Sequence, residues 1–412
     1  PFLGVLPALA GGVAVAGALL LGLTLEPALA GRSGAAPFAA LLLTLALPAL
    51  LGLGWATRRA TPLRLDPAHD QAEFGLLPSL WLYWRAEHGH AVDPAAHPHA
   101  GAAPPVRTAR RTGERQHLVV VQSESFFDVR RLWPDIQPEL LAHFDRACAE
   151  ALLHGRLEVP AWGANTMRTE FAFLSGLAAA HLGPHRFNPY RRLARRALPS
   201  LASRLRDAGY RTLCLHPHPA SFFARHRVMP QLGFDQFLDL AAFPGAQRVG
   251  PYIGDAAVGA KILELLAAAD APTFIYAITM ENHGPLHLER VAAGDVERLY
   301  RRPPPDGCDD LTVYLRHLGN ADRMLGALTE GLRAAHPAAL LCWFGDHVPS
   351  MPGVYAATGF DDGRSDYFVW CANRRGGTAL DTTAERLGGL VLEQLAKPSG
   401  RADDRAAAPA GP

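Results

Sequence analysis

From about residue 116 onward, short apolar runs rich in β-branched and aromatic residues alternate with longer segments of helical periodicity. Runs that are apolar on both faces are typical of central strands in a sheet that helices cover on each side. The alternation therefore predicts the α/β fold class, as a doubly wound, mostly parallel sheet. The predicted strands are 117–122, 210–215, 273–279 and 338–344. The predicted helices include 138–153, 197–208, 255–269 and 313–334.

Two long uncharged apolar runs, residues 2–25 and 35–56, lie ahead of this pattern. Each approaches the roughly 20 apolar residues that a helix needs to cross a bilayer. A signal peptide has a shorter apolar core and is not normally followed by a second span, so transmembrane helices within 1–56 are the better interpretation. The sequence begins at Pro1, and we expect further spans upstream. Arg58 and Arg59 close the second run, which the positive-inside rule assigns to the cytoplasmic side.

A connector rich in Pro, His and Arg, residues 57–115, joins these spans to the α/β domain, expected over 116–400. The apolar-aromatic patch 76–84 suits either an interfacial helix or ordinary packing onto the folded domain. Residues 401–412 are predicted to be a disordered tail. The 40 basic and 39 acidic residues give a net charge of +1, so nothing indicates a nucleic-acid partner. The five cysteines show no regular spacing, and no disulfide framework is predicted.

Polar residues of the kind that bind metals follow all four predicted strands. Ligands of open α/β sheets bind at the carboxyl ends of the strands. We therefore expect the residues after the strands to converge on one crevice although they lie far apart in sequence. Carboxylates and imidazoles together suit Mn²⁺ or Zn²⁺, or Mg²⁺ if waters complete its shell. The converging residues are Glu124, His216, His283, Asp346 and His347.

A nucleophile for such a site is available in the segment 163–170, where a glycine turn precedes hydroxyl residues and a predicted helix start. A hydroxyl at a helix N-terminus lies at the positive end of the helix dipole, which favours a bound phosphate. Coordination to a divalent cation would lower the pKa of a threonine there and activate it. The alternative is that Thr166 or Thr169 is only a helix cap, completed by Glu170.

Five blocks in this order resemble the lipoteichoic acid synthase family of the alkaline phosphatase–sulfatase superfamily, which includes the phosphoglycerol transferases. They are VVVQSESF (119–126), GANTMRTEFAFLSGL (163–177), HPHPASFFARHRVMPQLGFDQF (216–237), TMENHGP (279–285) and FGDHVPS (344–350). The resemblance implies an alkaline-phosphatase-like fold and a sulfatase-like catalytic domain over 116–400. It also implies that transmembrane helices precede an extracytoplasmic catalytic domain, in conflict with the orientation that Arg58 and Arg59 suggest.

Carried over by position, the resemblance implies a single divalent cation, Mn²⁺ or Mg²⁺ with Zn²⁺ as a further candidate. Thr166 is then both a metal ligand and the nucleophile, because its spacing to Glu170 matches the family pattern. His216 and His283 are implied to bind a phosphoryl oxygen or to protonate the leaving alcohol. The implied metal ligands are Glu124, Thr166, Asp346 and His347.

Three further positions bear on the substrate. Arg225 matches the substrate-binding arginine of the family, a bidentate phosphate partner. Phe223 stands where lipoteichoic acid synthases have tryptophan, and His218 stands where they have an acidic residue. These two positions contact the head group in the family, so the departures bear on which donor or acceptor is used.

The implied reaction is transfer of a phospholipid head group through a covalent phospho-threonine, with phosphatidylglycerol as donor and an envelope glycan or polymer as acceptor. Phosphoethanolamine is an alternative head group. The alternative functions are a phosphodiesterase or phosphatase of the same fold, and a non-catalytic envelope-assembly protein. A formylglycine sulfatase is disfavoured because no cysteine is followed by x-Pro-x-Arg. The high Ala, Arg, Gly and Pro content leads us to expect a bacterial protein. The resemblance, with the apolar N-terminus, implies that it lies in the inner membrane with a periplasmic catalytic domain.

Overall fold

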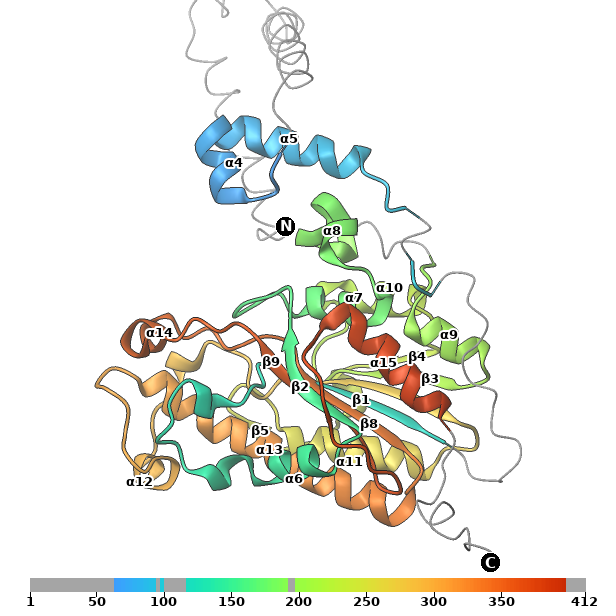
Figure 1. The fold of residues 1–412 in the computed structure, drawn as a ribbon, viewed down its shortest axis with the longest axis vertical. Coiled ribbons are helices and arrows are strands. Elements are labelled where there is room, and N and C mark those ends of the chain that lie inside the picture. The colour runs from blue at the N-terminus through green and yellow to red at the C-terminus, as the bar shows by residue number, and fades with distance from the viewer. Residues whose placement is uncertain (1–62, 94–96, 100–115, 192–196, 398–412) are drawn as a thin grey trace, which may run out of the picture. The chain divides into compact units, whose positions relative to one another are not determined.

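The computed structural model describes residues 63–93, 97–99, 116–191 and 197–397 (Figure 1). The chain forms two compact units, Pro1–Gly89 and His90–Pro412. The first unit contains helices α4 (Pro67–Phe74) and α5 (Leu76–Gly89). The second unit contains all the described strands and the remaining described helices.

A nine-stranded, mostly parallel sheet forms the centre of the second unit, with the order β10-β2-β9-β8-β1-β7-β3-β4 and β11 paired to β2. The five strands from β8 to β4 are parallel to one another. β9 is antiparallel to both of its neighbours. The strands are β1 (Leu118–Ser123), β2 (Leu153–Glu158), β3 (Arg211–Leu215), β4 (Gln236–Leu238), β7 (Thr273–Ile278), β8 (Leu340–Gly345), β9 (Ser365–Cys371), β10 (Thr378–Ala379) and β11 (Thr382–Thr383).

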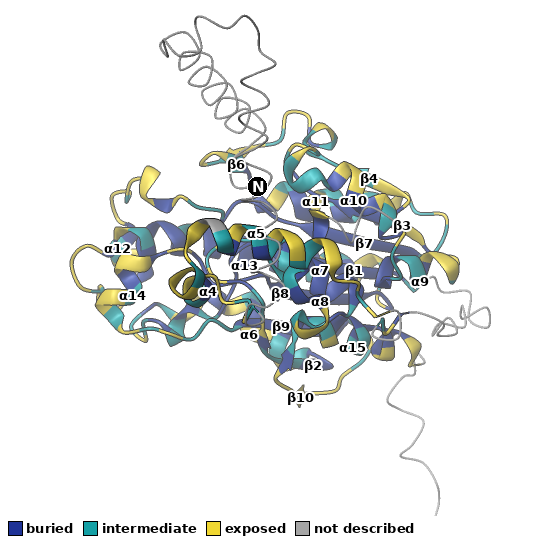
Figure 2. Ribbon diagram, turned by 90° about the horizontal axis from the view of Figure 1, so that it is seen from above, coloured by how far each residue is buried: buried dark blue, intermediate teal, exposed yellow. Residues whose placement is uncertain are grey.

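Helices cover both faces of this sheet, as the sequence predicts for a doubly wound fold (Figure 1). Strand residues alternate between two cores: Val119 and Val121 pack on one side of β1, and Leu118 and Val120 on the other. Figure 2 shows the buried residues concentrated on the strands and on the helix sides that face them. The first face carries α6 (Ala142–Glu150), α11 (Asp255–Ala267) and α13 (Asp309–Ala335). The second carries α7 (Thr166–Ser175), α9 (Leu201–Asp207), α10 (Arg225–Gln231) and α15 (Ala384–Ala396).

Smaller elements complete the second unit. A two-stranded antiparallel hairpin, β5 (Arg248–Val249) and β6 (Tyr252–Ile253), stands apart from the main sheet. The short α-helices are α8 (Ala179–Leu182), α12 (Asp295–Leu299) and α14 (Pro352–Thr358). Single 3-10 turns occupy Val129–Arg131, Pro138–Leu141, Gly183–Phe187, Pro189–Arg191, Phe222–Ala224, Leu240–Ala242 and Leu286–Leu288.

The four predicted strands correspond to β1, β3, β7 and β8, and the α/β fold class is confirmed. The predicted helix 138–153 is too long at its C-terminal end. Its first turn is a 3-10 turn, α6 ends at Glu150, and Ala151 is extended, because the chain must straighten before β2 begins at Leu153. Ser200 caps α9 through a reciprocal capping box with Ser203, which delays the predicted start of that helix to Leu201.

The apolar-aromatic patch 76–84 forms most of α5. Leu76, Leu80 and Trp84 are exposed on this helix. Within the ranges described above, no helix is both long and apolar enough to span a membrane. The predicted spans 2–25 and 35–56 and the predicted tail 401–412 lie outside the described residues.

Candidate metal centre and catalytic site

The adjacent parallel strands β1 and β8 bring Glu124 beside Asp346 and His347, because each strand ends immediately before these residues. Ser123 is in register with Gly345 at the carboxyl ends of the two strands. A Cβ atom on Gly345 would lie 1.8 Å from the carbonyl oxygen of Phe126. The two chain segments therefore meet at backbone contact, which only glycine permits at this position.

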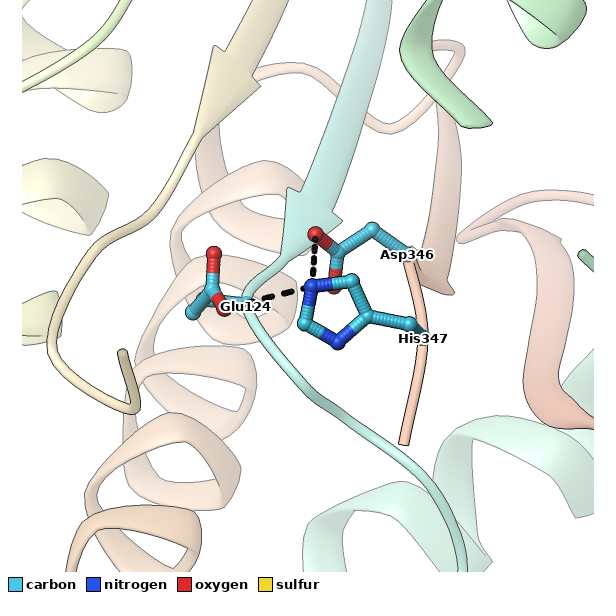
Figure 3. Close-up of side chains that lie close together, drawn as sticks. All are labelled: Glu124, Asp346 and His347. Atoms are coloured by element: carbon cyan, nitrogen blue, oxygen red, sulfur yellow. Dashed lines mark ion pairs between the residues drawn. The ribbon is translucent and has the colours of Figure 1, made fainter. Parts of the chain in front are cut away.

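Glu124, Asp346 and His347 form a tight, buried cluster, and their ligand atoms all lie within 4.8 Å of one another (Figure 3). Nε2 of His347 is 3.3 Å from Oδ2 of Asp346 and 3.7 Å from Oε1 of Glu124. Burial, together with the facing Asp346 carboxylate, raises the pKa of Glu124 to about 8. Two carboxylates this close and this buried repel each other unless a cation lies between them.

The hydrogen bonds around the cluster leave its lone pairs free for a cation. Nδ1 of His347 lies 3.0 Å from the carbonyl oxygen of Val348, which fixes the proton on Nδ1 and leaves the lone pair of Nε2 facing the carboxylates. Oδ2 of Asp346 is buried and has no hydrogen-bond donor among the described residues. Ser125 donates its hydroxyl to Oε1 of Glu124 and its backbone N–H to Oδ1 of Asp346, at 2.9 and 2.8 Å. This donor set of two carboxylates and one imidazole fits a divalent cation such as Mn²⁺, Zn²⁺ or Mg²⁺.

Thr166 joins the cluster as the first residue of α7, with Oγ1 3.5 Å from Nε2 of His347. The turn before it is made of Gly163 and Asn165, both with left-handed backbone angles, φ +64° and +69°. The Gly163 N–H donates to the carbonyl oxygen of Val348 at 3.0 Å, which ties the turn to the chain leaving β8. The start of α7 is thereby held against His347, and the hydroxyl lies at the positive end of the helix.

The capping alternative for this segment is not what the structure shows. Asn165 occupies the N-cap position, and its side chain makes no capping hydrogen bond. Thr169 donates its hydroxyl to the backbone carbonyl of Asp346 at 2.7 Å, a bond that supports the loop after β8. The Glu170 carboxylate pairs with Arg225 instead of completing a cap. Of the two hydroxyls, only that of Thr166 lies beside the ligand atom of His347.

Arg225, the implied phosphate partner, is buried in an ion pair with Glu170. Its Nη2 lies 2.8 Å from Oε2 of Glu170, and its Nε lies 3.2 Å from both carboxylate oxygens. Tyr190 donates its hydroxyl to the same carboxylate. Side-chain exposure is 1% for Arg225 and 0% for Glu170. Glu170 thus holds one edge of the guanidinium, and a phosphate would have to bind through its remaining N–H groups.

Replacing Glu170 by glutamine is expected to destabilise the folded protein by about 3–5 kcal/mol, because it leaves the Arg225 charge buried without its carboxylate. Urea unfolding monitored by circular dichroism measures the change. Glu264→Gln is the matched control, since it removes a carboxylate that is 65% exposed and paired with Lys261. That control should cost less than about 1 kcal/mol. Equal losses in the two variants would contradict a stabilising role for the buried pair.

His216 lies beside Arg225 with both of its ring nitrogens engaged. Nδ1 donates to the carbonyl oxygen of Ile278 at 3.1 Å, and Nε2 accepts from Nη1 of Arg225 at 3.2 Å. Burial and the neighbouring Arg225 charge lower the pKa of His216 well below its ordinary value of 6.5. The imidazole is therefore neutral and has no proton available for a leaving group in this arrangement.

His216→Asn is expected to make folding less sensitive to acid. Because the pKa of His216 is depressed in the folded protein, the unfolded chain binds a proton below pH 6.5 that the folded protein excludes. The stability contributed by His216 is present above that pH and falls by up to about 1.4 kcal/mol per pH unit below it. Urea unfolding of both proteins between about pH 7.5 and about pH 5 tests this. The stability advantage of the wild type should shrink as the pH falls; a constant difference would count against the buried neutral imidazole.

His283 is half-buried and differs from His216 in leaving one nitrogen available. Its Nδ1 lies 2.7 Å from the carbonyl oxygen of Gly284, which assigns the proton to Nδ1 in the neutral ring. The hydroxyl of Tyr252 lies 3.2 Å from the same nitrogen. Burial and the Glu124 carboxylate raise the pKa of Tyr252, so this hydroxyl feels the charge of the metal cluster. No motif points to Tyr252, which comes from the β5–β6 hairpin and lies in none of the five resembling blocks.

The two departures from the family pattern, His218 and Phe223, lie next to His216 and Arg225. The ring of His218 is 5.7 Å from that of His216 and 4.7 Å from that of Phe222. Its Nδ1 is buried without a hydrogen-bond partner among the described residues. The guanidinium of Arg225 lies 5.2 Å from the centre of the Phe223 ring. Phe223 therefore packs on the arginine, and His218 keeps a buried nitrogen without a partner among the described residues.

Glu281, which follows β7, is turned away from the metal cluster. It accepts from the backbone N–H of Asp255 at 2.7 Å, from the side-chain amide of Asn320, and lies 3.1 Å from Nδ1 of His317. These contacts anchor the loop that carries His283. The sequence marks Glu281 as one more polar residue after a strand but cannot show that it faces α13.

Comparison with known proteins places this site in a family. The sulfatase family model matches residues 116–382. A capsular polysaccharide biosynthesis protein, RkpI, from Rhizobium meliloti is 35% identical over 256 residues, which cover 61% of this chain and 44% of that protein. A putative cyclic β-1,2-glucan modification protein from the same organism is 30% identical over 251 residues, which cover 60% and 38%. The chain thus matches less than half the length of both relatives.

Two solved structures share the fold. The phosphoglycerol transferase GacH of Streptococcus pyogenes, in complex with sn-glycerol-1-phosphate, superposes with a TM-score of 0.55 and 21% identity, covering 68% of this chain and 75% of its own. The lipoteichoic acid synthase LtaP of Listeria monocytogenes gives a TM-score of 0.55 and 18% identity, covering 77% and 78%. The match of the family model over most of the described domain shows that the chain belongs to the sulfatase family.

Proposed function

We propose that this protein is a membrane-anchored, metal-dependent transferase that moves a phospholipid head group, phosphoglycerol in the first instance, onto an envelope glycan. The observation that carries the proposal is the Thr166 hydroxyl at the start of α7, 3.5 Å from Nε2 of His347 and next to a buried pair of carboxylates. A formylglycine sulfatase would need a different nucleophile at this position. The fold and the family support phosphoester chemistry at this centre.

Glu124, Asp346, His347 and Thr166 would hold the divalent cation, which would lower the pKa of the threonine hydroxyl and neutralise charge on the phosphoryl oxygens. Mn²⁺ or Mg²⁺ is the proposed ion. The reaction consists of two displacements at phosphorus, in which Thr166 is first the nucleophile and then the leaving group. Thr166 would attack as the alkoxide, its proton having passed to solvent. In the first step its Oγ forms a bond to phosphorus as the bond from phosphorus to the diacylglycerol oxygen breaks. In the second step an acceptor hydroxyl forms the new bond to phosphorus and Oγ of Thr166 leaves.

His283 is the proposed proton carrier for both steps. As the imidazolium it gives the Nε2 proton to the departing diacylglycerol oxygen, and it then takes a proton from the attacking acceptor hydroxyl. His216 is a poor candidate because Arg225 occupies its Nε2. The role of His216 is instead to position Arg225, whose remaining N–H groups would bind a phosphoryl oxygen. Tyr252 orients His283 through its hydroxyl.

The charges near His218 favour glycerol over ethanolamine in the head group. Burial lowers the pKa of His218, and the neighbouring Arg225 and His283 lower it further. An ammonium group would approach the Arg225 guanidinium there, whereas an uncharged diol would not be repelled by it. Phosphatidylglycerol is therefore the proposed donor, and phosphatidylethanolamine is the alternative.

Acceptor and location are proposed from the relatives and the N-terminal sequence. The names of the two Rhizobium meliloti relatives refer to capsular polysaccharide biosynthesis and to modification of cyclic β-1,2-glucan, which supports a glycan acceptor. The uncharged runs 2–25 and 35–56 would anchor the chain in the bacterial inner membrane beside a lipid donor, with the catalytic domain in the periplasm. Anchoring would keep the enzyme and its lipid donor in the plane of the same membrane.

The test uses the full chain in detergent with Mn²⁺, phosphatidylglycerol labelled in its head group, and purified cyclic β-1,2-glucan. We expect released diacylglycerol and label on the glucan. Diacylglycerol with label only in free glycerol phosphate would favour the hydrolase of the same fold. Label on glucan only from phosphatidylethanolamine would change the donor. Absence of turnover with either lipid would favour the non-catalytic alternative.

A further inference from the structure

A cavity of about 560 Å³ opens on the α13 side of the sheet, separate from the metal cluster. Its volume is in the range of sites for small organic ligands, about 300–1,000 Å³. Its floor is apolar, formed by buried Leu299 and Leu315 with Leu140 and Val249. The lining also includes planar polar side chains: the amides of Gln137, Gln247 and Asn320, and the guanidinium groups of Arg298, Arg316 and Arg323. We refer to this cavity as the α13 groove.

Two contacts link the α13 groove to the catalytic site. Val249 lines the groove, and its partner across the β5–β6 hairpin is Tyr252, whose hydroxyl contacts His283. Asn320 lines the groove and donates to Glu281, two residues before His283. A chain molecule lying in the groove could thus extend toward the proposed proton carrier along the hairpin.

The charges of the α13 groove are nearly balanced. Arg316 pairs with Glu289 and Asp295 at 2.8 and 3.2 Å, and Arg298 pairs with Asp295 at 2.6 Å. Arg323 donates to the side-chain oxygen of Asn320. Glu139 adds one negative charge at the rim. A groove with so little net charge does not attract a polyanion, but its fixed amide and guanidinium groups offer many hydrogen bonds.

We propose that the α13 groove binds the acceptor glycan, an inference that rests on the proposed transferase function and adds the place where its acceptor lies. Amide and guanidinium groups are planar and rigid, and they can meet neighbouring hydroxyls of one sugar ring with paired hydrogen bonds. The apolar floor suits the C–H faces of the rings. The volume accommodates a short segment of a glycan, whose remainder stays in solvent.

A direct measurement of glycan binding tests the proposal independently of the transfer reaction. Purified cyclic β-1,2-glucan is titrated calorimetrically into the full chain carrying Thr166→Ala, which prevents transfer. In that background, the double variant Gln247→Ala/Arg323→Ala removes two exposed side chains of the groove. We expect the Kd for glucan to rise at least about 10-fold, because two hydrogen-bonding groups are lost. The matched control is Arg206→Ala, an arginine 46% exposed on α9 at the opposite face of the sheet, which should leave Kd unchanged.

Three outcomes would overturn the proposal that the α13 groove binds glycan. They are no binding of glucan to the parent protein, an equal Kd for the parent and the double variant, or an equal rise in Kd in the Arg206→Ala control. Unchanged thermal unfolding midpoints for all variants exclude a general loss of structure. These measurements distinguish failure of the proposed glycan site from failure of the proposed transferase function. Binding that depends on Gln247 and Arg323 supports the groove even if no head group is transferred, whereas transfer with unaffected binding in the double variant rejects the groove alone.

Discussion

Replacing Thr166 by alanine is expected to reduce diacylglycerol release by about 10⁴-fold or more, the scale of losing a covalent nucleophile. The Thr166 hydroxyl is the one that lies beside Nε2 of His347, while the Thr169 hydroxyl is bonded to a backbone carbonyl. The Thr169 hydroxyl therefore cannot replace it without moving α7. The rate of diacylglycerol release from phosphatidylglycerol, with saturating Mn²⁺, is the measurement.

Two further variants separate the nucleophile from general effects. Thr166→Ser keeps a hydroxyl at the same place and should retain part of the activity. Thr329→Ala removes a hydroxyl that bonds only to carbonyl oxygens of its own helix, α13, and should leave the rate within about twofold. A Thr166→Ala enzyme with more than a few per cent of wild-type activity would contradict a threonine nucleophile.

Asp346→Asn is expected to weaken binding of Mn²⁺ by about 100-fold or more and to abolish turnover. The reason is the geometry of the cluster: Oδ2 of Asp346 is buried, has no other partner among the described residues and faces Nε2 of His347 at 3.3 Å. Neutralising it removes half of the carboxylate charge that would compensate the ion. Calorimetric titration of Mn²⁺ into chelator-treated protein measures the affinity.

Asp366→Asn is the control for this change, because it removes another buried carboxylate, one that pairs with Arg131 at 2.6 Å instead of facing the cluster. Its Mn²⁺ affinity should match that of the wild type even if folding is weakened. Equal affinities in Asp346→Asn and wild type would place the ion elsewhere in the chain.

Much of the fold could be predicted from hydrophobic pattern alone. Strands β1, β3, β7 and β8 are apolar on both faces, since helices cover them, and such runs stand out in a sequence. β2 was missed because three of its six residues, His154, Gly155 and Arg156, are only partly buried and give no apolar run. The antiparallel placement of β9 depends on long-range pairing with β2 and β8, which local pattern does not encode.

The convergence of Glu124, Asp346 and His347 was predictable, because residues that follow neighbouring parallel strands meet at one edge of the sheet. Contacts that depend on how side chains pack could not be predicted from the sequence. The pairing of Glu170 with Arg225 joins two blocks that the sequence treats separately, and it changes the expected role of His216. Tyr252 is carried by a short hairpin without a motif, so only the folded chain reveals its contact with His283.

The most direct test of the central claim is a search for the covalent intermediate. The full chain would be mixed with Mn²⁺ and phosphatidylglycerol without a glycan acceptor, quenched in acid and digested for mass spectrometry. The account predicts one added phosphoglycerol group on the peptide that carries Thr166, absent from the Thr166→Ala protein. Steady release of diacylglycerol with no adduct on Thr166, or an adduct on another residue, would contradict it.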